Sequence, residues 1–119
     1  MSADRSALVV EDNREIARFM SLMLSQMGFV VDIAGDGQVA LDSISAAPPD
    51  LVLLDLNIPK ITGVEVLHHI RADEQCARTK VVIVSANPHM IDESYDLADL
   101  VLQKPISYNQ LHDLIARLF

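Results

Sequence analysis

The segment LVLLDLNIP, residues 51–59, decides how this chain folds. Residues 51–54 are bulky aliphatics, and an apolar run of this length is typical of a strand that is buried on both faces. Pro59 has no backbone N–H to donate, so it ends the strand and stiffens the loop. Asp55 therefore lies at the carboxyl end of a buried strand, where open parallel sheets place ligands and chemistry. A carboxylate in that position is a metal ligand, a nucleophile or a helix cap.

Strand-like and helix-like segments alternate along the rest of the chain. Short apolar runs predict four more strands, at residues 7–10, 29–34, 80–84 and 100–103. Apolar residues at helical spacing predict helices after Asn13, near residues 38–46, around residues 64–70 and after Ser107, with at most a short helix within residues 89–97. Asn13 and Ser107 are good helix N-caps, and Gly28 is a typical helix stop.

The apolar stripes of these helices predict which side chains are buried. The first helix has Ile16, Phe19, Met20, Met23, Leu24 and Met27 at helical spacing. The third has Val64, Leu67 and Ile70, and the last has Leu111, Leu114, Ile115 and Leu118. The methionines of the first stripe are expected to fill the core rather than to form a binding surface.

The alternation of strands and helices also predicts the fold class. It specifies an α/β fold with a parallel sheet and helices on both faces. The sequence contains no repeats, linkers or low-complexity tracts, and its 119 residues are enough for one hydrophobic core. We therefore expect residues 1–119 to form a single domain.

The composition excludes several classes of protein. Lys and Arg number 9 against 17 Asp and Glu, a net charge of −8, so the basic footprint that nucleic-acid binding needs is absent. The sequence has no apolar run of the about 20 residues that span a bilayer and no basic amphipathic segment, so membrane binding is not expected. Cys76 is the only cysteine, which excludes an internal disulfide and fits a reducing cytoplasm.

Polar residues stand at the ends of four predicted strands. Glu11 and Asp12 follow the first strand, Asp55 the third, Ser85 the fourth and Lys104 the fifth. Because the carboxyl ends of parallel strands face one edge of a sheet, these side chains are expected to converge. Carboxylates held close repel one another unless a cation is present, and a few oxygen ligands suit Mg²⁺, which adds water and phosphate oxygens. The sequence therefore predicts a site that places a phosphoryl group on a carboxylate oxygen.

These residues also carry a resemblance to a known family. From about Ser6 to Phe119 the chain resembles the receiver domain of bacterial two-component response regulators. The matching pieces are Val9-Val10-Glu11-Asp12-Asn13, Leu53-Leu54-Asp55-Leu56-Asn57-Ile58-Pro59, Gly63, Val84-Ser85-Ala86 and Lys104-Pro105. One acidic pair or one Lys-Pro is a weak signal, whereas the whole set in order is a specific one.

The resemblance implies a fold and a function. The fold is flavodoxin-like, a doubly wound sheet of five strands in the order 2-1-3-4-5. Asp55 would accept a phosphoryl group from a phosphohistidine on a sensor histidine kinase or a phosphotransfer protein, and Ser85 and Lys104 would each contact a phosphoryl oxygen. Mg²⁺ would be held by Asp12, Asp55 and the backbone carbonyl of Asn57, with Glu11 acting partly through water. Such a domain catalyses only its own phosphorylation and dephosphorylation, and relays the signal to an effector protein or effector domain.

Two features depart from the family pattern. The family usually has Tyr or Phe three residues before the Lys, where this chain has Val101, and the segment from Ser85 to Lys104 is a few residues short. The fourth helix is therefore expected to be short. In the family the ring moves inward when the hydroxyl residue swings toward the phosphate, so this chain is not expected to signal through an aromatic switch. A shift of the loop at residues 86–92 is the expected response.

Simpler interpretations exist for several single residues. Glu11 and Asp12 on their own would suit a helix cap, Ser85 a turn, and Lys104 a solvated surface position. Cys76 lies in a polar stretch and is expected to be an exposed loop thiol.

Two other classes of protein require sequence features that this chain lacks. A phosphatase of the haloacid dehalogenase type needs a second Asp where this chain has Asn57, and a nucleotide or flavin binder needs a Gly-rich or Ser/Thr-rich loop after the first strand. A degenerate receiver that acts as a phosphorylation-independent interaction module stays open as the alternative. The sequence also leaves open the oligomeric state, and whether the chain is a single-domain regulator or part of a longer protein.

Overall fold

The computed structural model describes residues 4–86 and 96–119. In these residues the order is β1 (Arg5–Val10), α1 (Arg14–Gln26), β2 (Phe29–Ala34), α2 (Gly37–Ala46), β3 (Leu51–Asp55), α3 (Gly63–Ala72), the 3-10 turn η1 (Glu74–Cys76), β4 (Lys80–Ser85), β5 (Leu100–Gln103) and α4 (Tyr108–Leu118). All neighbouring strands pair in parallel, in the order β2-β1-β3-β4-β5. The predicted flavodoxin-like strand order is confirmed.

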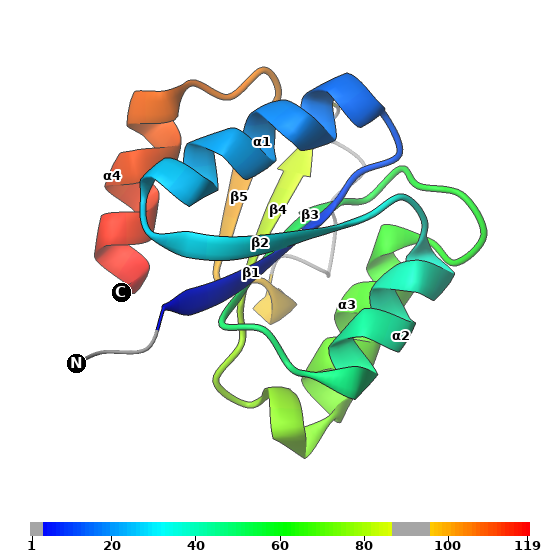
Figure 1. The fold of residues 1–119 in the computed structure, drawn as a ribbon. Coiled ribbons are helices and arrows are strands. Elements are labelled where there is room, and N and C mark those ends of the chain that lie inside the picture. The colour runs from blue at the N-terminus through cyan, green and yellow to red at the C-terminus, as the bar shows by residue number, and fades with distance from the viewer. Residues whose placement is uncertain (1–3, 87–95) are drawn as a thin grey trace.

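Helices cover both faces of the sheet (Figure 1). Val9 and Leu53 belong to the core shared with α1 and α4, whereas the adjacent residues Leu8 and Leu54 belong to the core shared with α2 and α3. All four side chains are buried, as a strand enclosed on both faces requires. No helix in the described part of the chain is both long and apolar enough to cross a membrane.

The helix termini follow the signals in the sequence. The side chain of Asn13 accepts hydrogen bonds from the backbone N–H groups of Glu15 and Ile16 and so caps α1. Gly28 follows that helix with φ of 94°, a left-handed conformation that glycine adopts without steric cost. Ser107 and Gln110 form a reciprocal capping box at the start of α4.

Some details of the expected packing were wrong. Phe19 belongs to the apolar stripe of α1 but is 55% exposed, and α3 buries Val66 more deeply than the expected Val64. Cys76 is buried, because the turn η1 folds it against the core beneath α3. The expected short helix within residues 89–97 falls mostly outside the described residues.

Arg71, near the end of α3, ties three segments together at the amino-terminal edge of β4 and β5. Its guanidinium donates to the backbone oxygens of Leu97 (2.6 Å) and Thr79 (2.9 Å) and to the Asp99 carboxylate (2.9 Å). The same carboxylate accepts the backbone N–H of Val81 at 2.8 Å. Arg71 therefore fixes where the chain enters β5.

Replacing Arg71 with Met should lower the free energy of unfolding by about 2 kcal/mol, because partly buried carbonyl groups lose their donors. The exposed Arg78→Met is the matched control, and it should change stability by less than about 0.5 kcal/mol. Urea unfolding followed by circular dichroism measures both values. Equal stability of the two variants would mean that water replaces the guanidinium at no cost.

Candidate functional site

The carboxyl edge of the sheet gathers the polar residues expected there. β1 leads directly into Glu11 and Asp12, Asp55 is the last residue of β3, and Ser85 is the last residue of β4. Single carboxylate oxygens of Glu11, Asp12 and Asp55 all lie within 4.8 Å of one another. The convergence follows from the parallel register, in which Val10 pairs with Leu54 and Asp55 with Val84.

Lys104 joins two of these acids. Its ammonium nitrogen lies 2.5 Å from Glu11 Oε1 and 2.9 Å from Asp55 Oδ2. The side chains of Glu11 and Asp55 are only 1% and 9% exposed, and that of Lys104 is 17% exposed. An ion pair this deeply buried is weakly screened by solvent, so removing one partner would leave a poorly compensated buried charge on the others.

The other oxygen of each carboxylate is held by the backbone. Asn13 N–H donates to Glu11 Oε2 at 3.1 Å, and Asn57 N–H donates to Asp55 Oδ1 at 3.0 Å. Lys104 N–H donates to the backbone oxygen of Ser85 at 2.8 Å, which joins the end of β5 to the end of β4. The two acids are therefore oriented by the loops that follow their strands as well as by Lys104.

Burial and charge act in opposite directions on the pKa values of Glu11 and Lys104. Burial raises the pKa of Glu11 above its ordinary value of 4.5, against the lowering effects of Lys104 and the Asn13 N–H. Burial by itself lowers the pKa of Lys104, but hydrogen bonds to Glu11 and Asp55 outweigh it and raise that pKa. Lys104 is therefore fully charged at neutral pH.

The acidic cluster has the chemistry of a magnesium site. Three carboxylates face a single ammonium group, so the cluster carries an excess of negative charge. All three offer hard oxygen ligands, and Asp12 is exposed, which leaves room for the waters that Mg²⁺ retains. Glu11, Asp12 and Asp55 fit this ion. Asn57, whose backbone carbonyl was expected as a further ligand, lies next to them at the start of the loop after β3.

Ser85 lies on the opposite side of Asp55 from the acidic pair. It is buried at the end of β4 and lines a cavity of about 240 Å³ together with Asn57 and Thr62. Thr62 was not identified in the sequence, where it is visible only as a helix cap; its hydroxyl accepts the backbone N–H of Glu65. The six residues expected at the site are therefore all found at this edge of the sheet.

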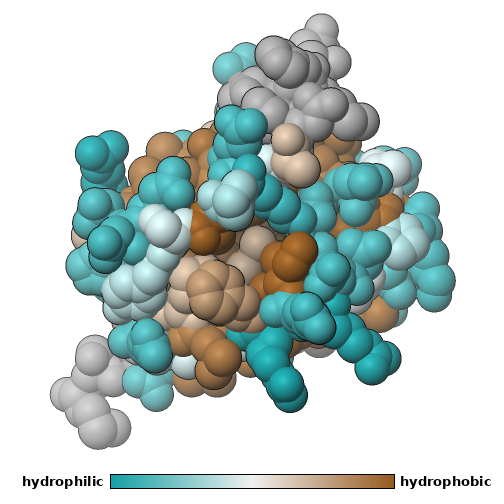
Figure 2. Space-filling view, turned by 90° about the horizontal axis from the view of Figure 1, so that it is seen from above, coloured by the Kyte–Doolittle hydropathy of each residue, from teal (hydrophilic) through white to brown (hydrophobic). Residues whose placement is uncertain are grey.

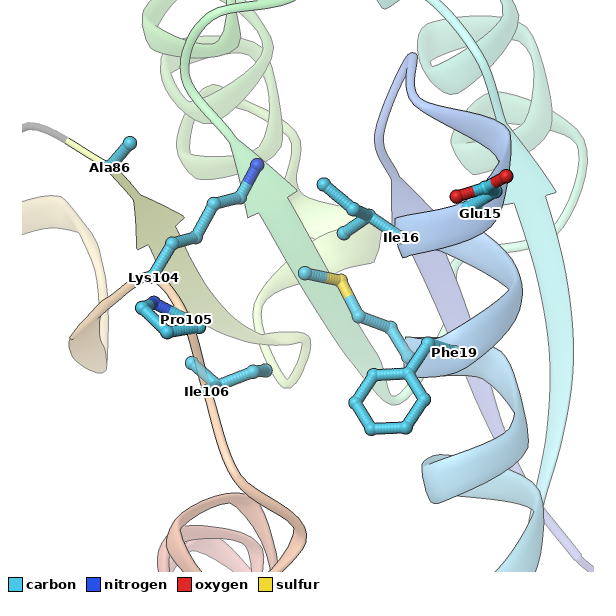
Figure 3. A pocket seen from close by; sticks show the side chains of 8 residues that line it. Glu15, Ile16, Phe19, Ala86, Lys104, Pro105 and Ile106 are labelled. Carbon is cyan, nitrogen blue, oxygen red and sulfur yellow. The ribbon is translucent and has the colours of Figure 1, made fainter.

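An apolar groove of about 540 Å³ opens beside the site. Its walls are formed by Glu15, Ile16, Phe19 and Met20 of α1, by Ala86 after β4, and by Lys104, Pro105 and Ile106 after β5. In Figure 2 apolar side chains gather in a hollow near the middle of this face, with polar residues on both sides. In Figure 3 the stem of Lys104 lies on one wall, facing Ile16 and Phe19. The helical spacing of Ile16 and Phe19 predicted that both are buried in the core, so the groove was not expected from the sequence.

Comparison with known proteins gives the family. The model of the response regulator receiver domain matches residues 7–116, so the chain belongs to the receiver family of two-component response regulators. It is 37% identical over 114 residues to the response regulator ArlR of Staphylococcus epidermidis, covering 93% of this chain and 49% of that protein. The chain thus spans about half the length of this relative.

Solved structures agree with this assignment. A CheY-like receiver domain from Methylobacillus flagellatus superposes with a TM-score of 0.90 at 29% identity, covering 98% of this chain and 100% of that one. The response regulator TrrA of Thermotoga maritima, determined in complex with Mg²⁺ and BeF, superposes with a TM-score of 0.88 at 29% identity, covering 97% and 99% of the two chains.

Replacing Lys104 with Met should lower the free energy of unfolding by about 3 kcal/mol at pH 7, because two buried carboxylates lose their counter-charge. A raised pKa for Glu11 means that its contribution to stability is present at low pH and is lost as the pH rises. Without Lys104 that pKa rises further, so the stability gap between variant and wild type should widen from pH 4 to pH 8.

Urea unfolding from pH 4 to pH 8 measures this difference in stability between Lys104→Met and the wild-type chain. Lys60→Met is the control, since the Lys60 side chain is 68% exposed and its pair with Asp36 is solvent-screened. A gap for Lys104→Met that does not change with pH would show that Lys104 does not affect the titration of Glu11.

Proposed function

We propose that this chain is a phospho-accepting receiver domain, formed by residues 1–119, in which Asp55 takes a phosphoryl group from a phosphohistidine donor. The observation that carries the proposal is the contact of Lys104 with both Asp55 and Glu11 at the carboxyl edge of the sheet. Asp55 is thereby a carboxylate at a strand end with an ammonium group and two further acids in reach.

The proposed transfer of the phosphoryl group is an in-line displacement at phosphorus. A carboxylate oxygen of Asp55 forms a P–O bond while the P–N bond of the phosphohistidine breaks. The bonding electron pair returns to the imidazole nitrogen, and the histidine leaves as neutral imidazole if its other ring nitrogen carries the proton. Phosphoryl transfer needs little covalent chemistry from the protein. The receiver would contribute by positioning the phosphoryl group and by stabilising its charge.

The charges around Asp55 suit such a step. Mg²⁺ held by Asp12, Asp55 and the Asn57 carbonyl, with Glu11 partly through water, would neutralise charge on the phosphoryl oxygens. Lys104 lies 2.9 Å from Asp55 Oδ2 and is placed to pair with one phosphoryl oxygen. Ser85, at the neighbouring strand end, is placed to hydrogen-bond another.

The apolar groove supports a protein as the phosphoryl donor. Lys104 lines the groove with its aliphatic stem and reaches Asp55 with its ammonium group, so the groove and the acceptor share one side chain. A phosphohistidine that reaches Asp55 must bring its own scaffold over this surface. We propose that the groove receives apolar side chains from a sensor histidine kinase or a phosphotransfer protein beside its phosphohistidine. A cytoplasmic location is part of this proposal, since a sequence with Cys76 as its one cysteine fits a reducing compartment.

Transmission of the signal is proposed to proceed without an aromatic switch. Val101 is partly buried against the core shared with α2 and α3 and has no ring to move. The loop at residues 86–92, where the response is expected, lies mostly outside the described residues. The response would be read by an effector protein or an effector domain. The alternative, a degenerate receiver that works without phosphorylation, has no observation in its favour.

Intact-mass measurement after incubation with acetyl phosphate and Mg²⁺ tests the acceptor. The wild-type chain should gain one phosphoryl group, and Asp55→Asn should gain none, because an amide oxygen does not form the acyl phosphate under these conditions. Equal labelling of the two proteins would remove Asp55 from the acceptor role, and no labelling of either would favour the degenerate receiver.

The donor in this test is a phosphorylated protein that labels the wild-type chain. Replacing Phe19 with Asp should slow transfer from that donor by about tenfold or more, since central aromatic contacts dominate docking. Labelling by acetyl phosphate should be unchanged, because this small donor needs no docking surface. Leu22→Asp is the matched control, because Leu22 is similarly exposed on the same helix and does not line the groove. Equal slowing by both variants would attribute the effect to charge alone.

A further inference from the structure

Gly37, the first residue of α2, lies directly against the loop that follows the acceptor strand. A Cβ added at Gly37 would lie 2.0 Å from the backbone oxygen of Ile61 and 2.7 Å from its carbonyl carbon. The backbone N–H of Gly37 donates to the backbone oxygen of Pro59 at 3.2 Å. Only glycine permits this approach, because a backbone atom cannot swing aside as a flexible side chain does.

The loop that Gly37 contacts is constrained from several sides. Lys60 adopts φ of 68°, which is uncommon for a residue with a side chain. Its solvent-screened pair with Asp36, at 3.5 Å, adds little to this constraint. Asp36 also caps α2 through the Val39 N–H. At the far end of the loop, a Cβ on Gly63 would lie 2.5 Å from the backbone oxygen of Asp55. The loop is therefore held between the start of α2 and the end of β3.

We propose that Gly37 is a positioning residue for the phosphoryl and metal site, and that α2 acts through it on the loop that carries Asn57. This inference rests on the proposed function. Asn57 precedes Pro59 by two residues, and its N–H orients Asp55 Oδ1 at 3.0 Å. The Pro59 ring limits how far the loop bends between the two contacts. Displacing Pro59 and Ile61 therefore moves the backbone of Asn57, whose N–H donates to Asp55 and whose carbonyl is the proposed metal ligand.

A purely structural role for Gly37 makes a different prediction. If Gly37 only allows α2 to pack, an added methyl group lowers the free energy of unfolding and leaves the affinity for Mg²⁺ unchanged. If Gly37 positions the loop, the affinity for Mg²⁺ falls as well. Loss of a group that orients a metal ligand typically lowers metal affinity by about 10- to 100-fold. Metal affinity thus separates the two roles.

The test compares Gly37→Ala with Gly35→Ala. Gly35 is two residues away, and an added Cβ there meets no atom within 4 Å. Isothermal titration with Mg²⁺ alone should show about a tenfold weaker affinity for Gly37→Ala and a change of less than about twofold for Gly35→Ala. Thermal unfolding of both variants verifies that the titrated protein is folded. Wild-type affinity in a folded Gly37→Ala would overturn the inference, whereas absence of Mg²⁺ binding by wild type and Gly35→Ala would overturn the proposed function.

Hydrogen exchange in the wild-type chain tests the same coupling if Gly37→Ala does not fold. Coupling between two sites is reciprocal, so Mg²⁺ binding should strengthen the contact between Gly37 and Pro59. The Gly37 amide should exchange more slowly with Mg²⁺ than without it, and the Gly35 amide should not change. Equal exchange of the Gly37 amide in the two conditions would overturn the inference.

Discussion

The buried contact of Lys104 with Glu11 and Asp55 is the interaction on which the rest of this site depends. Two carboxylates are withdrawn almost completely from solvent at neighbouring strand ends, and one ammonium group from a third strand end lies between them. Removing one partner of a buried ion pair is strongly destabilising, so the three side chains hold one another in place. The parallel sheet makes the contact available, since it brings all strand ends to one edge.

Lys104 also connects the acid cluster to the apolar groove on the surface. Its stem is part of the apolar groove between α1 and the segment after β5, while its head belongs to the acid cluster. A donor protein that covers the groove would therefore also cover the stem of Lys104 and exclude water around the acids. Exclusion of water strengthens electrostatic interactions, so docking on the groove and stabilisation of the transferred charge would support each other.

The loop after β3 depends on a helix that is distant from it in sequence. Its residues are adjacent in sequence to Asp55, yet its path is fixed by contacts from Gly37, the first residue of α2. Helix α2 lies on the face of the sheet opposite α1 (Figure 1). The site is thus oriented from both faces, by α1 and the segment after β5 on one and by α2 through the loop on the other.

Much of the fold was predictable because local patterns specified it. The apolar runs predicted all five strands, and Asn13, Gly28 and Ser107 predicted helix termini that the structure confirms. Burial was less predictable. Phe19 has helical spacing but lies on the side of α1 that no element covers in the described residues, and Cys76 is buried by a turn that its polar neighbours do not indicate.

The sequence by itself determined the alternation of elements, the order of the site residues along the chain and the excess of negative charge, because these depend on neighbours within a few positions. Only the tertiary structure decided which carboxylates Lys104 contacts, that a groove opens beside it, and that Gly37 lies against Ile61. Each of these joins residues that are far apart in sequence. Their distances depend on how helices pack across a sheet, and no local pattern of residues encodes that packing.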